Sequence, residues 1–219
     1  MEAALEMLDA SGDARFAALA HQVADLFLHH IIDRKTGVLR EFFTADWKPL
    51  DSAEGHIIEP GHMLEWVWIL VRAHRLLGLA TLDDVQRLYA FATYHGTDAH
   101  TGLIYDQIRS TGAPLSRDSR LWPQTEALKA HIAMMETFGL DTSPQISVTV
   151  DNLFRHYLDH APWVHGLTIA VLMVAPRSTK FRLPPCITCN WRLPNCSVPN
   201  PHLDMTQWLF EKALSKTFL

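Results

Sequence analysis

The chain has 219 residues, of which 48% are hydrophobic and 20% are charged, and its formal net charge at pH 7 is -5. A chain of this length and composition can bury an apolar core, which excludes intrinsic disorder. The acidic balance and the lack of a Lys/Arg cluster argue against nucleic acid as a partner, because phosphate binding needs a concentrated basic face.

The first thirteen residues are acidic and have no basic segment ahead of an apolar one, which is not the pattern of a secretory signal. No apolar run approaches the roughly 18 residues that a membrane-spanning helix needs. The three cysteines lie between Cys186 and Cys196, so the body of the chain has no disulfide framework. We therefore expect a cytoplasmic protein without membrane contact.

Helical periodicity dominates from residue 1 to about residue 160. Residues 14–32 carry side chains at steps of three and four that predict one buried stripe, made of Phe16, Leu19, Val23, Leu26 and His30. Residues 62–77 repeat the pattern, and Gly78 supplies the stop. Thr81 and Asp84 resemble a capping box that opens a third helix, ending at residues 95–96.

Pro123 suits the first turn of a helix that runs to Phe138, and Ser143 with Pro144 opens another. The helices therefore follow one another as consecutive hairpins, and the fold class is all-α. The longer connections, residues 33–60 and 96–120, contain short alternating pieces that predict small β-hairpins. Long loops between antiparallel helices are where functional sites are usually built.

The character of the chain changes after residue 162. Residues 164–183 show no helical amphipathicity, and residues 182–201 are dense in proline and cysteine. We expect one helical domain over residues 1–162 and an irregular tail over residues 163–219.

The first motif that could carry a chemical reaction is Glu59-Pro-Gly-His62-Met-Leu-Glu65-Trp66. His62 falls in the first turn of the predicted helix, and Glu65 lies on the same helix face. The positive end of the helix dipole favours the neutral imidazole that a general base needs, and Glu65 could orient the ring. Without further context, such a pair is structural more often than catalytic.

The second motif is Arg120-Leu-Trp122-Pro-Gln124-Thr-Glu126-Ala-Leu-Lys129. It puts an indole, an amide and a carboxylate at a junction between a loop and a helix. An aromatic face beside hydrogen-bonding groups suits a sugar ring. The alternative interpretation is that Trp122 belongs to the core and that Glu126 only complements the helix dipole.

Together, the two motifs resemble the N-acylglucosamine 2-epimerase superfamily, which includes cellobiose 2-epimerases and mannose isomerases. The resemblance runs in order from Glu2 to His160. It implies an (α/α)6 barrel and a sugar substrate in its open-chain form. It also implies that histidines move a proton at carbon 2 without metal or other cofactor. Carried over by position, His62 is the catalytic acid/base and Glu65 its partner; the groups that contact the sugar are Glu59, Trp66, Arg120, Trp122, Gln124 and Glu126.

Two departures from the family pattern bear on completeness. A family motif of the type Asn-Pro-His-Met-His-Leu would precede the segment that resembles Glu2–Leu5. We therefore expect an incomplete barrel, roughly the C-terminal half of the hairpins, and a chain whose own activity is doubtful. Helix faces left exposed in this way favour aggregation or a homodimer.

The second departure is the tail. The family closes with a segment like Val-Pro-Ala-Ser-Thr-Leu-Tyr-His-Leu, which holds a second histidine. Reading the codons from Lys180 onward one nucleotide earlier permits this segment, so we hypothesise a frameshift near residues 162–167. The tail also contains the ligand types of a zinc knuckle, namely Cys186, Cys189, Cys196 and His202. We favour the frameshift and expect no metal.

Two other functions stay open at this point. Glu65 and Glu126 could form the carboxylate pair of a glycoside hydrolase or lyase, although His62 in the best motif argues against it. A non-catalytic fragment that binds carbohydrate or protein is the other alternative. A phosphorylated sugar would require basic groups, for which Arg117, Arg120 and Lys129 are the candidates.

Overall fold

The computed structural model describes residues 1–158. The predicted tail, with its frameshift and its zinc ligands, lies outside the described residues. The described part is mainly helical, as expected. Its helices are α1 (Glu2–Ser11), α2 (Ala14–Leu26), α3 (Pro60–Leu77), α4 (Leu82–Gly96), α5 (Leu121–Phe138) and α6 (Ser143–Leu153), with shorter helical turns at Phe27–Ile31, Glu54–His56 and Phe154–Leu158.

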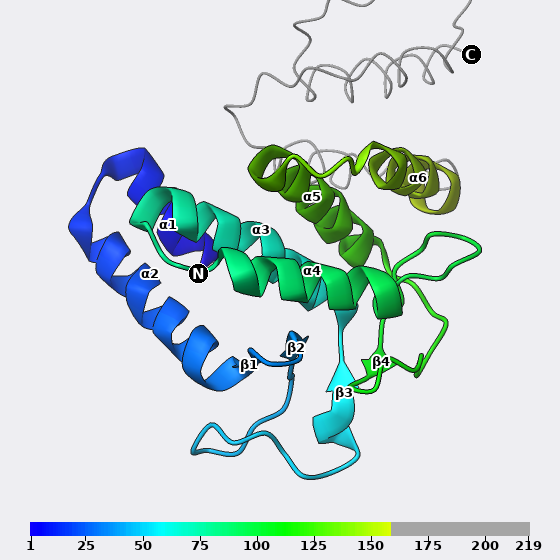
Figure 1. Ribbon diagram of the computed structural model, residues 1–219, viewed down its shortest axis with the longest axis horizontal. Helices are drawn as coiled ribbons and strands as arrows, with labels where there is room; N and C mark the ends of the chain where they lie inside the picture. Colours follow the sequence, from blue (N-terminus) through cyan, green and yellow to red (C-terminus); the bar gives the residue numbers. More distant parts are fainter. Residues whose placement is uncertain (159–219) are drawn as a thin grey trace, which may run out of the picture. The chain divides into compact units, whose positions relative to one another are not determined.

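Helix α3 is at the centre of this arrangement, since it packs against α1, α2, α4 and α5, while α6 packs against α5. Two long loops, between α2 and α3 and between α4 and α5, carry short strands below α3 and α4 in the view of Figure 1. Strands β1 (Ile32–Asp33) and β2 (Val38–Leu39) pair antiparallel within the first loop. Strands β3 (Ile57–Ile58) and β4 (Ile108–Arg109) pair antiparallel between the loops. The starts of α3 and α5 are therefore tied to the same end of the molecule.

The core forms around α3, because its apolar side chains face α4 on one side and α5 on the other. Met63, Leu64, Val67 and Leu70 of α3 are all 0% exposed. Burying a side chain of this size typically contributes about 1.5 to 3 kcal/mol. The expected helix end at Gly78 is confirmed, because this residue adopts the left-handed conformation with φ 69°. None of the helices within residues 1–158 is long and apolar enough to cross a membrane.

The predicted stripe on α2 is wrong in part. Leu19 is 49% exposed, and His30 is exposed as well. The buried positions are Ala20, Ala24 and Phe27, one residue away from the expected row. Small alanine side chains bring the α2 backbone close to its neighbours, so the helix turns this face inward and leaves the larger leucine outside.

The capping box predicted at the start of α4 is also wrong, although the helix itself is confirmed. The Thr81 hydroxyl donates to the carbonyl oxygen of Leu70 at 3.0 Å instead of capping the helix. Asp84 is 0% exposed, and its two oxygens accept hydrogen bonds from Arg34 at 2.9 and 2.8 Å. Partners from other elements thus replaced the local cap, and the ion pair fastens the β1–β2 turn to α4.

A buried polar pair joins α4 to α5. The Tyr89 hydroxyl lies 2.8 Å from Nδ1 of His131, which is 4% exposed. Burial lowers the pKa of His131 to about 4 and raises that of Tyr89 to about 12.

This pair predicts a pH dependence of stability. Because the pKa of His131 falls from its ordinary 6.5 to about 4 on folding, the unfolded state binds more protons between these values. The contribution of His131 is therefore complete above pH 6.5 and is lost as the pH falls toward 4. We expect the free energy of unfolding to drop by about 2 kcal/mol more between pH 7 and pH 5 in the parent than in His131→Gln. Urea unfolding at both pH values measures this difference, and equal drops would contradict it.

Candidate functional site

The starts of α3 and α5 and the two long loops before them make up one end of the helical hairpins, here called the loop end. The most prominent polar contact at this end is between Glu41 and His62. The Glu41 carboxylate follows β2, and its Oε2 lies 3.0 Å from Nδ1 of His62 in the first turn of α3. Its Oε1 accepts the backbone N–H of Glu59, the residue before α3, at 3.3 Å. One carboxylate therefore both anchors the start of α3 and fixes the His62 ring. The His62 side chain remains 39% exposed, so it can reach a ligand.

The protonation of His62 differs from the expectation. The hydrogen bond that the His62 ring donates to Glu41 raises the pKa of His62 above its usual value. Burial opposes this shift, and the charges of Glu41, Glu59 and Glu65 reinforce it. Three carboxylates from the first loop and the start of α3 thus favour the charged imidazolium. Glu41 also takes the orienting role that the sequence had suggested for Glu65. A histidine of this kind accepts a proton readily and holds it as a stabilised imidazolium.

Trp122 from the start of α5 lies directly beside His62. The centres of the two rings are 4.9 Å apart, with an angle of 37° between their planes. This approach depends on Gly61, since a Cβ there would lie 2.6 Å from Cη2 and 2.8 Å from Cζ3 of Trp122. The Pro60-Gly61-His62 sequence thus starts helix α3 and also leaves space for the Trp122 indole.

Gly61→Ala should consequently lower the free energy of unfolding by about 1 to 3 kcal/mol, because the added methyl group overpacks against the indole. The double variant Gly61→Ala/Trp122→Ala provides the control, since the clash partner is then gone. In urea titrations we expect Gly61→Ala to cost much less in the Trp122→Ala background than in the parent. Equal costs in both backgrounds would show that the indole does not constrain Gly61.

An ion-pair network flanks these rings. Arg120 donates from Nη2 to Oε2 of Glu59 at 3.3 Å, and its Nε lies 3.0 Å from Oδ1 of Asp106. The guanidinium carbon is 5.5 Å from the centre of the Trp122 ring. Gln107 donates to Oε1 of Glu59 at 3.3 Å. The predicted residues Glu59 and Arg120 are therefore brought to His62 and Trp122, but they already bind protein partners.

A second polar group lies one turn further along α3 and α5. Oε2 of Glu126 accepts the indole N–H of Trp68 at 2.8 Å and pairs with Nζ of Lys129 at 2.6 Å. Lys129 also lies over the Trp68 ring, 4.2 Å from its centre. Burial, followed by the nearby charge of Glu126, raises the pKa of Glu65. The negative charges of Glu65 and Glu126 thus repel each other across the α3–α5 contact.

Two predicted ligand-contacting residues have structural roles in this arrangement. Gln124 is 1% exposed, and its amide bonds both to the backbone N–H and to the carbonyl oxygen of Ile104, at 3.0 and 3.1 Å. Trp66 stacks on Phe27, with ring centres 3.7 Å apart. The amide of Gln124 therefore secures the loop before α5, and Phe27 covers one face of the partly buried Trp66 indole. Ligand contact by Gln124 and Trp66 stays a prediction.

Sequence reasoning missed Glu41, Trp68 and Asp106 as members of the site. Glu41 and Asp106 do carry a recognisable signal, since the segments Asp33-Arg-Lys-Thr-Gly-Val-Leu-Arg-Glu41 and Asp98-Ala-His-Thr-Gly-Leu-Ile-Tyr-Asp106 have the same spacing. Each segment follows a helix and ends in a carboxylate. A search for internal repeats would have found them.

The repeated segments also fold alike. In each, the glycine has φ 74° and donates its N–H to the carbonyl oxygen of the first aspartate at 2.8 Å. Each final carboxylate accepts the backbone N–H of the residue before the next helix: Glu41 from Glu59 at 3.3 Å, and Asp106 from Arg120 at 2.9 Å. Equivalent hydrogen bonds, from a backbone N–H to a loop carboxylate, therefore stand at the starts of α3 and α5. The carboxylate of the first holds a histidine, and that of the second holds an arginine.

The part of the chain from residue 1 to 158 contains no group of three or more His, Cys, Asp or Glu side chains placed to hold a metal ion.

The arrangement of hairpins places the protein in a known fold class. A crystal structure of a D-mannose isomerase superposes with a TM-score of 0.62 at 18% sequence identity, over 73% of this chain and 44% of that one. The described residues thus form part of a helical barrel of that type. The sequence profile of the N-acylglucosamine 2-epimerase (GlcNAc 2-epimerase) family matches residues 1–170, and the chain belongs to this family.

Individual relatives agree with this assignment. A mannose-6-phosphate isomerase from Rhizobium meliloti (strain 1021) is 37% identical over 118 residues, which are 53% of this chain and 30% of the relative. A cellobiose 2-epimerase from Bacteroides fragilis is 28% identical over 162 residues, which are 71% of this chain and 40% of the relative. The chain thus spans 30% and 40% of the lengths of these two relatives.

Proposed function

We propose that the chain carries a proton-transfer site of a sugar 2-epimerase or aldose–ketose isomerase, with His62 as the acid/base. The observation that carries the proposal is the position of the His62 ring, 3.0 Å from the Glu41 carboxylate and 4.9 Å from the Trp122 ring centre while still 39% exposed. An anchored imidazole beside an aromatic face fits a reaction in which a proton moves on a sugar.

The chemistry follows from the bonding of the two ring nitrogens. Nδ1 faces Glu41, so Nε2 is the nitrogen left to face a ligand. Neutral His62 removes the proton from carbon 2 of the open-chain sugar, and the electron pair moves into an enediolate. Glu41 stabilises the imidazolium that forms. His62 then delivers the proton to carbon 1 while the proton of the carbon-2 hydroxyl moves to the oxygen on carbon 1, which gives the ketose. Epimerisation instead requires a second acid that delivers a proton to the opposite face of carbon 2.

We further propose an unphosphorylated sugar. Two of the candidate phosphate binders are already neutralised, Arg120 by Asp106 and Glu59, and Lys129 by Glu126. Arg117, the third candidate, is exposed, and no hydrogen bond or ion pair joins it to His62, Glu41 or Trp122 within residues 1–158. Mannose should therefore be preferred to mannose 6-phosphate, which comparison of the two substrates at equal concentration would test.

The glycoside hydrolase alternative receives less support. It requires Glu126 as a free carboxylate, whereas Glu126 is 12% exposed and bonded to both Trp68 and Lys129. Removal of a proton from carbon 2 needs no such group.

The proposal is tested by incubating the purified full chain with mannose, glucose, fructose, N-acetylmannosamine and cellobiose and separating the sugars afterwards. Conversion between aldose and ketose, or between 2-epimers, supports the proposal. Release of glucose from cellobiose without epimer formation would instead favour the hydrolase.

A further inference from the structure

We infer that Asp106, Arg120 and Glu59 form a chain of ion pairs, here called the relay, that ends on His62. Through this relay, the loop before α5 sets the proton affinity of a histidine that the loop before α3 holds. This inference deepens the proposed function and rests on it for its catalytic meaning. Asp106 and Arg120 act as positioning residues, because they reach His62 only through Glu59.

The contacts run without a gap from one loop to the other. Oδ1 of Asp106 lies 3.0 Å from Nε of Arg120 and also accepts its backbone N–H at 2.9 Å. Nη2 of Arg120 lies 3.3 Å from Oε2 of Glu59. The same Oε2 lies 3.7 Å from Nδ1 of His62. The Glu59 carboxylate is therefore shared between a permanent cation and the titrating imidazole.

Burial makes this sharing effective. The side chains of Asp106 and Glu59 are only 14% and 18% exposed, so water screens them incompletely. Gln107 holds the other oxygen of Glu59 at 3.3 Å, which prevents the carboxylate from turning fully toward His62. The arginine therefore balances part of the negative charge that His62 would otherwise feel.

The repeated loops explain why the relay ends at this place. Glu41 and Asp106 occupy the same position in the two segments, and each accepts the backbone N–H of the residue before its helix, Glu59 or Arg120. Pairing of β3 with β4 then brings the two helix starts together. The side chains of Glu59 and Arg120 bond to each other, so each loop holds one end of the pair.

The charged groups that face His62 are Glu41 from the first loop, Glu59 before α3, and Glu65 on α3 itself. Arg120 before α5 faces Glu59. Loss of the Arg120 charge leaves Glu59 uncompensated, so the imidazolium is better stabilised and the pKa of His62 rises. Loss of the Glu59 charge has the opposite effect. A merely structural role for these residues predicts no such pair of opposite shifts.

The test is an NMR titration of the His62 ring in the full-length chain, with its signal assigned by its loss in His62→Gln. We expect Arg120→Met to raise the proton affinity of His62 roughly two- to fivefold and Glu59→Gln to lower it by a similar factor. Arg120→Lys, which keeps the charge, should lie between the parent and Arg120→Met. The matched control is Arg117→Met, which removes an exposed arginine outside the network and should leave the titration unchanged.

Unchanged His62 titration in both Arg120→Met and Glu59→Gln, with circular dichroism equal to the parent, would overturn the relay. Equal shifts in Arg117→Met and Arg120→Met would overturn it too, because they would reflect net charge alone. The titration needs no substrate, so the relay can fail while sugar conversion is observed. Conversely, it can hold in a chain that converts no sugar, which separates this inference from the proposed function.

Discussion

Replacement of His62 by glutamine should abolish sugar conversion, with a loss of about a hundred- to ten-thousand-fold in kcat/KM. Glutamine keeps a polar side chain near Glu41 but cannot take up a proton from carbon 2. The free energy of unfolding should change little, because the His62 side chain is 39% exposed. Initial rates on the best sugar, with unfolding curves for the same preparations, measure both effects.

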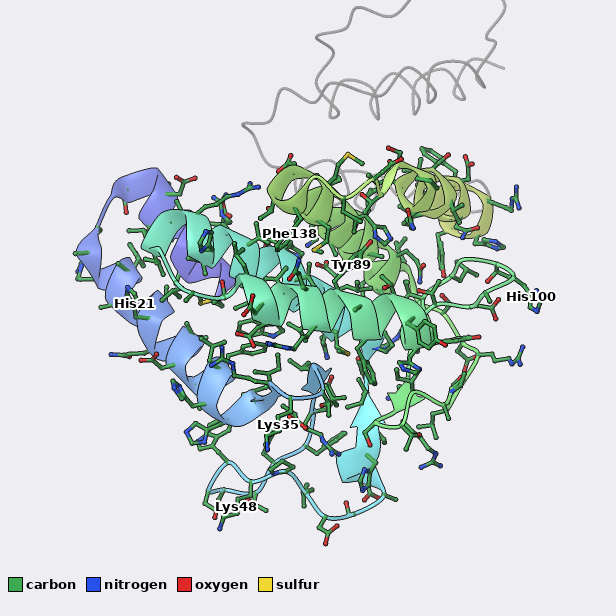
Figure 2. All side chains as sticks on the ribbon, in the orientation of Figure 1. His21, Lys35, Lys48, Tyr89, His100 and Phe138 are labelled. Atoms are coloured by element: carbon green, nitrogen blue, oxygen red, sulfur yellow. The ribbon has the colours of Figure 1, made fainter. Side chains whose placement is uncertain are left out.

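His21→Gln is the matched control for this substitution. His21 projects from α2 (Figure 2), is exposed, and lies outside the loop end that carries the site. It should retain the parental rate. A His62→Gln protein that converts sugar as fast as His21→Gln would remove His62 from the mechanism.

Replacement of Glu41 by glutamine should have the second largest effect. It removes the main cause of the raised pKa of His62, so that pKa should fall. The acidic limb of the pH profile of kcat/KM should then move to lower pH, because His62 stays neutral over a wider range. The maximal rate should still fall, by about a hundredfold, since the ring loses its fixed orientation and the imidazolium loses its partner.

Glu54→Gln is the control for Glu41→Gln. Glu54 is an exposed carboxylate in the same loop, and it accepts a hydrogen bond from Ser52 at 2.7 Å. It should leave both the pH profile and the maximal rate unchanged. An unshifted acidic limb in Glu41→Gln would show that another group controls the titration seen in catalysis.

The helices were predictable because their signals are local. The apolar spacing in residues 62–77, the glycine at position 78 and the proline at position 123 each fix a helix or one of its ends, and all three are confirmed. The contact between the two motifs was predictable only through family resemblance, since nothing in either motif alone indicates that Trp122 reaches His62.

Other features escaped prediction because they depend on partners distant in sequence. Asp84 was expected to cap its own helix, but it is buried and pairs with Arg34, fifty residues earlier in the chain. Glu65 is close to His62 in sequence, yet Glu41 reaches the ring from the preceding loop. The direction of the His62 pKa shift depends on these tertiary carboxylates, so helix position alone gave the wrong sign.

Solvent exchange at carbon 2 tests the central claim most directly. A single base that removes and returns a proton on one face exchanges it with water, even where the second group needed for net conversion does not act. In D2O, the full chain should introduce deuterium at carbon 2 of mannose, and His62→Gln should not. Carbon-bound deuterium that appears equally with both proteins, or with neither, would contradict the assignment of His62 as the proton-transfer group.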